Sequence, residues 1–159
     1  MEKLSLVLWQ ERELLETLLF RLEVEQLVLA HGRTGWLMRA AREVEAVLET
    51  LREVEVLRSV AAAEACEGLG LPADTPLREV ATRSAEPWRT TLMDHHEAFT
   101  TITRQVIDMA DANRHLITSG YRSARETLLS LAEQAPESYS PDGSAVAATP
   151  GARLVDRSL

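Results

Sequence analysis

The chain has 159 residues, a length typical of one domain. Hydrophobic residues make up 45% of it and aromatic residues only 4%, a composition that favours packed helices over a sheet. The net charge of −8 and the pI near 5.0 exclude the basic surface that a nucleic-acid-binding protein needs. We therefore expect no nucleic-acid partner.

Cysteine content and apolar run length limit the other classes. Cys66 is the only cysteine, so neither a disulfide framework nor a cysteine-based zinc site is expected. Residues 1–10 lack the basic start and small-residue cleavage site of a signal peptide. The apolar runs are far shorter than the roughly 18 to 20 residues that cross a bilayer. A cytoplasmic location without membrane insertion is the resulting expectation.

The first predicted element is a helix over residues 4–29. Its leucines recur every seven residues, which is the spacing of a coiled-coil seam. The members of this seam are Leu8, Leu15, Leu22 and Leu29. Gly32 follows and can end the helix in the left-handed conformation, and Thr34 is the expected N-cap of the next helix.

The second helix is predicted over residues 36–67 and ends in a glycine-rich stretch before Pro72. Its apolar residues alternate by threes and fours, at Leu37, Ala40, Val44, Val47, Leu51 and Val54. The short connection between the first two helices predicts that they are antiparallel neighbours. A short helix is then expected through about Arg83, with Thr75 as its N-cap and Pro76 at its first position.

The longest predicted helix covers residues 88–131. One seam reads Leu92, Phe99, Val106, Asn113 and Gly120, and the other reads His95, Ile102, Met109 and Leu116. Beyond Asn113 the apolar positions move to Ile117, Ala124, Leu128 and Leu131, so this half offers apolar surface on more than one side.

These elements predict an all-α fold, an elongated antiparallel helical bundle or coiled-coil hairpin. It consists of three long helices and one short inserted helix. The helical domain is predicted to cover residues 1–134. Residues 135–159 are rich in Pro, Ser and Ala and are expected to form a disordered tail, because they cannot bury enough apolar surface to offset the entropy of ordering.

No cluster in the sequence indicates catalysis. The run 94–97 reads Asp-His-His-Glu, but consecutive helical residues point about 100° apart and no Glu-x-x-His motif is present. His95 is expected to line the seam and His96 to lie at its edge. Cys66 has only carboxylates near it in sequence, which do not favour a thiolate. We expect no enzyme activity, no cofactor and no metal site.

Two positions of the long helix have alternative interpretations. Asn113 on an apolar seam costs stability, and it either fixes register or partner choice or is a polar residue satisfied within the bundle. Gly120 costs about 1 kcal/mol relative to alanine unless another backbone comes close. Tyr121 beside it is a side chain of the kind that often contacts partners.

The run 112–121, Ala-Asn-Arg-His-Leu-Ile-Thr-Ser-Gly-Tyr, followed by Leu-Leu-Ser-Leu at 128–131, resembles the C-terminal signature of FlgN-type flagellar export chaperones. Residues 8–15 and 42–45 are similar to the first two helices of that family. The resemblance covers residues 4–132 and depends mainly on the Asn-x-x-Leu-Ile element late in a long helix.

This resemblance implies a cytosolic chaperone of the flagellar type III secretion system. It would bind the terminal helices of hook–filament junction proteins and deliver these clients to the export gate. The implied client-binding residues are Asn113, Leu116, Ile117, Ala124, Leu128 and Leu131. Tyr121 resembles the tyrosine that contacts the cytoplasmic domain of the gate. The Pro/Ser/Ala-rich tail departs from the family pattern.

Two other hypotheses stay open at this point. The exposed stripe could pair with its own copy, which would make the protein a self-associating coiled-coil scaffold or adaptor and a homodimer. A metal-binding bundle is a weaker hypothesis, in which Glu and His side chains assemble through space.

Overall fold

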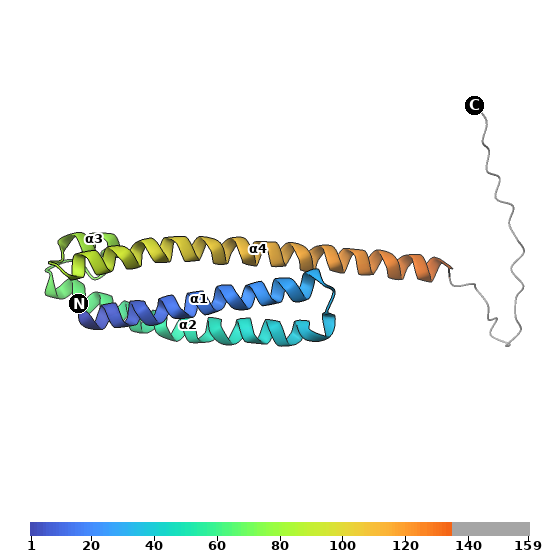
Figure 1. Cartoon of the computed structure of the whole chain (residues 1–159), viewed down its shortest axis with the longest axis horizontal. Coiled ribbons are helices and arrows are strands. Elements are labelled where there is room, and N and C mark those ends of the chain that lie inside the picture. The colour runs from blue at the N-terminus through green and yellow to red at the C-terminus, as the bar shows by residue number, and fades with distance from the viewer. Residues whose placement is uncertain (135–159) are drawn as a thin grey trace, which may run out of the picture. The chain divides into compact units, whose positions relative to one another are not determined.

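The computed structural model describes residues 1–134, with side chains up to residue 132. These residues form four helices and no strand: α1 (Glu2–Ala30), α2 (Thr34–Gly68), α3 (Leu77–Arg83) and α4 (Trp88–Gln134) (Figure 1). The predicted all-α fold, with three long helices and a short inserted one, is confirmed. The predicted tail, residues 135–159, lies outside the described residues. The chain divides into a unit of residues 1–117 and a second unit that starts at residue 118, and α4 contributes to both.

Glycines end the first two helices. Gly32 has φ +62°; its N–H donates to the carbonyl oxygen of Leu29, and the N–H of Arg33 donates to that of Val28. This pair of bonds defines a Schellman motif, which satisfies carbonyls that the helix end leaves without a partner. Gly70, with φ +69°, ends α2 through the same pattern of bonds. The predicted left-handed glycine after the first helix is confirmed.

The two predicted threonine caps are wrong. Thr34 is the first residue of α2, and no side chain caps that helix. The hydroxyl of Thr75 donates to the carbonyl oxygen of Pro72 at 2.7 Å, and Pro76 takes the N-cap position of α3, with Leu77 as its first residue. At Thr75 the physical reason is visible, since a hydroxyl that bonds to the preceding turn does not cap the following helix.

Ion pairs between α1 and α2 show how the two helices run relative to each other. They join Lys3 to Glu64 (2.7 Å), Glu11 to Arg58 (2.9 Å) and Arg21 to Glu43 (2.7 Å). The residue number rises along α1 while that of the partner falls along α2, so the two helices are antiparallel neighbours, as predicted.

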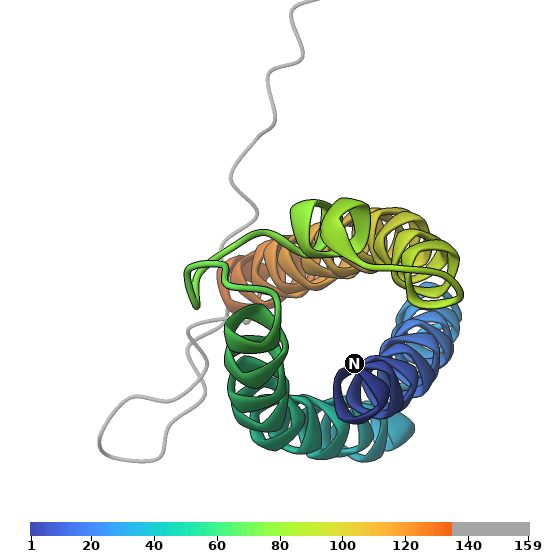
Figure 2. The ribbon, with the colours of Figure 1, turned by 90° about the vertical axis from the view of Figure 1, so that its left-hand side faces the viewer.

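The main core cluster lies at the end of the first unit where α1 begins and α2 ends. It brings together side chains from all four helices, and α3 lies at this end as well (Figures 1 and 2). The buried members are Leu4, Leu8, Ala61, Ala65, Cys66, Val80, Ala81 and Leu92. Farther along the unit, Leu18 and the seam positions Leu22, Val54 and Ile102 are also buried.

Candidate functional site

Asn113 lies inside the first unit. Its side chain is 2% exposed, and its Nδ2 donates to the carbonyl oxygen of Leu22 at 2.9 Å and to Oε2 of Glu25 at 3.0 Å. These two bonds tie α4 to α1, because both acceptors belong to α1. Asn113 therefore directs its side chain into the bundle in this structure, and its predicted contact with a client stays a prediction. The interpretation of Asn113 as a polar residue of the bundle agrees with this placement.

Leu116, the last residue of its seam, and Ile117 beside it end the first unit. Leu116 is half-buried and Ile117 is 48% exposed. The burial of the α4 seam therefore decreases at the end of this unit, after the fully packed positions Leu92 and Ile102.

The second unit carries an apolar stripe on its part of α4. Tyr121, Ala124, Leu128 and Leu131 follow one another at spacings of three and four residues, so they share one face of the helix. Tyr121 is 71%, Leu128 67% and Leu131 58% exposed, and Ala124 is exposed as well. We call these four residues the 121–131 stripe.

Leu129 belongs beside this stripe, although the sequence did not single it out. It is 54% exposed and follows Leu128 directly. The signal that could have identified it is the doubled leucine in the run Leu128-Leu129-Ser130-Leu131. A leucine that follows the stripe by one residue widens the apolar surface to a second side of the helix.

Gly120 has open space around it. A Cβ atom added there would meet no heavy atom within 4 Å, and its φ is not in the left-handed region. Neither packing among the described residues nor backbone geometry therefore explains this glycine. Its absence of a side chain leaves the helix backbone accessible next to Tyr121, whose side chain is exposed.

His95 is a core residue of the first unit. It is 1% exposed, and its ring lies edge-on to Trp9 with centroids 4.8 Å apart and stacks on Phe99 at 6.1 Å. Neither ring nitrogen has a hydrogen-bond partner. Burial, followed by the charge of Arg12, lowers the pKa of His95, and Asp94 opposes that shift. His95 thus lines the seam as predicted, and His96 is half-buried beside it.

The candidate metal-binding and nucleophilic residues are scattered or buried in the structure. The described residues contain no group of three or more His, Cys, Asp or Glu side chains that could hold an ion. Cys66 is fully buried in the main core cluster. Its surroundings are apolar side chains, so it contributes to packing in this structure.

The described residues define an all-helical bundle, and an exposed apolar stripe is the kind of surface that an amphipathic helix can cover. A family model described as FlgN protein matches residues 1–147. Because the match covers most of the chain, the chain belongs to the FlgN family, a family of flagellar export chaperones that is not known for enzymatic activity. The resemblance inferred from the sequence is confirmed.

The comparison with curated proteins and the comparison with solved structures found no match. Among the residues that the structure describes, no helix is both long and apolar enough to cross a membrane.

Proposed function

We propose that this chain is an export chaperone for hook–filament junction proteins of the flagellar type III secretion system. It holds a terminal helix of the client against the 121–131 stripe and delivers the client to the export gate. The observation that carries this proposal is the exposure of the stripe in a chain that belongs to a chaperone family.

Client binding on this stripe has a simple physical basis. An unassembled amphipathic helix exposes an apolar face that promotes aggregation. Leu128 and Leu131 are 67% and 58% exposed, so covering both with a client helix contributes about 2–4 kcal/mol of hydrophobic free energy. Release then requires a competitor for the same client face or for the chaperone, and the export gate is the proposed competitor.

The remaining predicted contacts have different roles in this proposal. Leu116 and Ile117, at the end of the first unit, are proposed as further client contacts. Tyr121 contacts the cytoplasmic domain of the gate through its exposed ring and hydroxyl. Asn113 stabilises the packing of α4 on α1.

Replacing either stripe leucine with aspartate is expected to abolish client binding. The substitution removes apolar contact area and places a carboxylate where the client would desolvate it, so Leu128→Asp or Leu131→Asp weakens binding about thirtyfold or more. Binding of a purified junction protein is measured by isothermal titration calorimetry, and helicity by circular dichroism.

Leu6→Asp is the matched control, because Leu6 on α1 is 65% exposed and lies outside the stripe. It should leave client affinity unchanged. If both stripe variants bind the client as tightly as wild type, the proposed surface is wrong.

Tyr121→Ala is expected to weaken binding to the export gate much more than binding to the client. Client affinity should change by less than about threefold, because Leu128 and Leu131 supply most of the apolar area. Binding to the cytoplasmic domain of the gate should fall about tenfold or more. Both affinities are measured with the same protein preparation. An equal loss for both partners contradicts the division of labour.

Self-association through the stripe is the competing function, since an apolar stripe can also pair with its own copy. Sedimentation of the free chain and of the chain mixed with a junction protein distinguishes the two. A monomer that forms a complex with one client molecule supports the chaperone function. A tight dimer that takes up no client supports the scaffold.

A further inference from the structure

A shallow groove follows the line along which α1 packs against α4 inside the first unit. It consists of two depressions of about 430 Å³ and 310 Å³ that share Leu19, Glu23 and Gln105. On α4 the lining side chains are Ala98, Ile102, Gln105, Met109 and Ala112. Spacings of four and three residues keep such a row on one side of a helix, so the groove runs along the helix axes for about 21 Å.

The floor of the groove is apolar and contains small residues. Leu19 of α1 lines it together with Ile102 and Met109 of α4, and all three are buried or half-buried. Ala98 and Ala112 lie near the two ends of the α4 row. Alanines at a helix contact allow the axis of another helix to come close.

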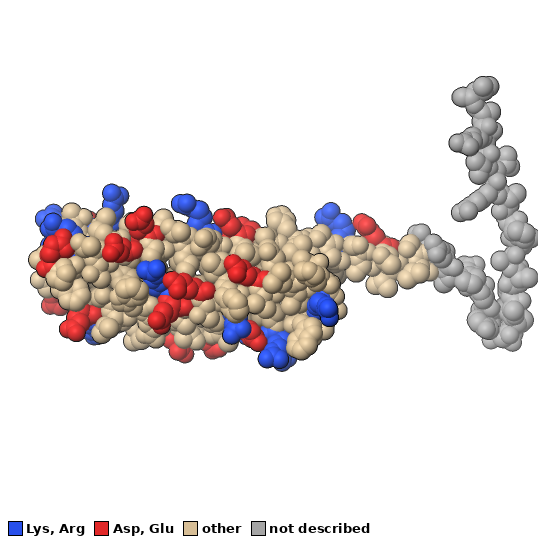
Figure 3. Space-filling model, in the orientation of Figure 1, with Lys and Arg blue, Asp and Glu red and all other residues tan. Residues whose placement is uncertain are grey.

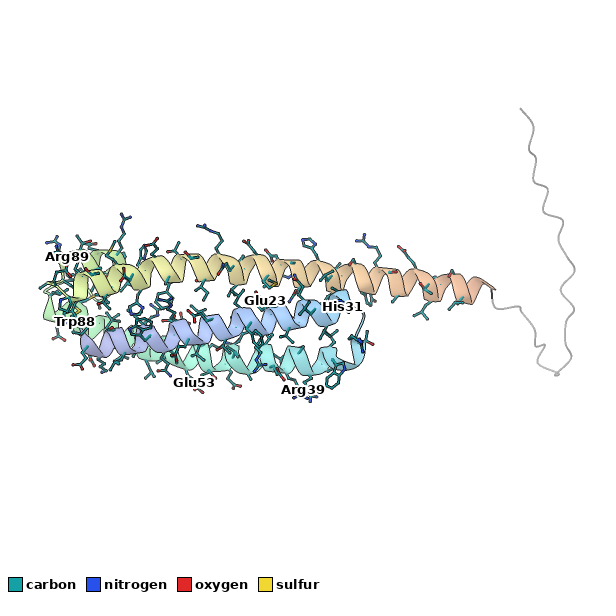
Figure 4. All side chains as sticks on the ribbon, in the orientation of Figure 1. Glu23, His31, Arg39, Glu53, Trp88 and Arg89 are labelled. Carbon is teal, nitrogen blue, oxygen red and sulfur yellow. The ribbon has the colours of Figure 1, made fainter. Side chains whose placement is uncertain are left out.

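The walls of the groove are acidic on both sides. Glu16 and Glu23 project from α1, and Glu97 and Asp108 project from α4; all four are exposed. Acidic side chains are visible between α1 and α4 in Figure 3, and Glu23 is labelled in Figure 4.

The one cation among the lining residues is already occupied. Nε of Arg12 lies 3.1 Å from Oε1 of Glu16, and its guanidinium lies over the Trp9 ring, 5.4 Å from the centroid. Glu23, Glu97 and Asp108 are left without a cationic partner in the groove. Each would gain Coulomb energy from a cation held beside the apolar floor.

We infer that this groove docks a basic amphipathic helix of a partner protein, with an apolar ridge on the floor and lysines or arginines against both walls. A helix fits because the backbone groups of α1 and α4 bond within their own helices and offer no edge to an extended peptide. A second copy of this chain does not fit, because pairing two such grooves brings carboxylates together.

This inference is independent of the proposed chaperone activity. The 121–131 stripe lies in the other unit and carries Arg122 and Arg125 together with Glu126 near its apolar residues. The groove, by contrast, has four carboxylates and one cation. The two surfaces therefore recognise partners of different charge, and the failure of one proposal leaves the other standing.

Two synthetic amphipathic peptides of roughly 16 residues test the inference. Both have the same leucine and alanine ridge; one has lysines on both flanks and the other has glutamates. Binding to the isotope-labelled full chain is followed by amide NMR at low and high salt. The lysine peptide should bind saturably, perturb residues 12–26 and 98–112, and bind more weakly at high salt. The glutamate peptide should not bind.

Charge variants on opposite walls provide the decisive comparison. Glu23→Lys combined with Asp108→Lys should weaken the lysine peptide about tenfold or more, because attraction becomes repulsion at two exposed positions. Glu45→Lys combined with Glu49→Lys on α2 changes the net charge equally, at exposed positions outside the groove, and should have an effect of less than threefold. Ala112→Leu should also weaken binding by filling one depression while all the carboxylates remain.

Three results would overturn the inference. Equal affinity for the lysine peptide and the glutamate peptide would show that the groove does not select its partner by charge. Perturbations confined to residues 118–132, or no saturable binding, would remove the groove as a site. Equal effects of the groove pair and the α2 pair would reduce the interaction to net charge.

Discussion

The two parts of α4 have the same kind of sequence pattern and opposite burial. In the first unit, Leu92, His95 and Asn113 are each 2% exposed or less. In the second unit, every described side chain from residue 118 to residue 132 is exposed, although Tyr121, Ala124, Leu128 and Leu131 keep the spacing of an amphipathic helix. A repeat of apolar residues therefore identifies the face of a helix that is suited to burial, and it does not say which chain will bury it.

The largest expected difference between these parts is in stability. Leu92→Ala should lower the free energy of unfolding by about 2–5 kcal/mol, because it leaves a cavity in the main core cluster. Leu128→Ala should change it by less than about 0.5 kcal/mol, since Leu128 is 67% exposed. Urea unfolding followed by circular dichroism measures both. Similar losses for the two variants would mean that Leu128 is packed in solution, which contradicts the comparison.

A smaller effect is expected at Asn113. Asn113→Ala removes the bonds to Leu22 and Glu25 and should cost about 1–2 kcal/mol of unfolding free energy. Gln105→Ala, an exposed polar truncation on the same helix, is the control and should be nearly neutral. A neutral Asn113→Ala that weakens client binding would instead assign Asn113 to the client surface.

The smallest effect is a pH dependence at His95. Burial and Arg12 lower the pKa of His95 below the ordinary value of 6.5. The imidazole of His95 therefore binds a proton more readily in the unfolded chain than in the folded chain. The contribution of His95 to the free energy of unfolding is fully present above about pH 6.5. It is lost as the pH falls below that value, by at most about 1.4 kcal/mol per pH unit. Urea unfolding at several pH values measures this loss.

The variant His95→Leu should remove this part of the pH dependence, whereas His115→Leu, at an exposed position of α4, should keep it. Glu11, whose pKa burial raises against the opposing effect of Arg58, titrates in all three proteins and cancels in the difference. If the free energy of unfolding depends on pH in the same way for wild type and His95→Leu, then His95 has the same pKa in the folded and the unfolded chain.

The fold could be predicted from the sequence because its signals are local and repeated. The leucine seam predicted α1. Gly32 has a positive φ at the end of this helix, where a left-handed glycine was predicted. The bounds of α2 and α3 differ from prediction by one or two residues, because Thr34 and Thr75 do not take the N-cap positions.

The site was less predictable, because it depends on how helices rotate against each other. Asn113 could face either α1 or a client, and only the packed arrangement shows that it bonds to Leu22. The groove between α1 and α4 has no linear signal at all, since Glu23 and Asp108 are 85 positions apart in the chain and line the same depression only because α1 packs against α4. The exposed 121–131 stripe agrees with the sequence pattern, which predicted apolar surface on more than one side of the late part of the helix.

Amide hydrogen exchange over residues 118–132, with and without a purified junction protein, tests the central claim most directly. In the free chain these amides should exchange quickly, because exposed residues of a helix end open readily. With the client bound, they should become strongly protected, while protection within residues 1–117 changes little. A complex that forms without protecting residues 118–132 would contradict the proposal that this part of α4 holds the client.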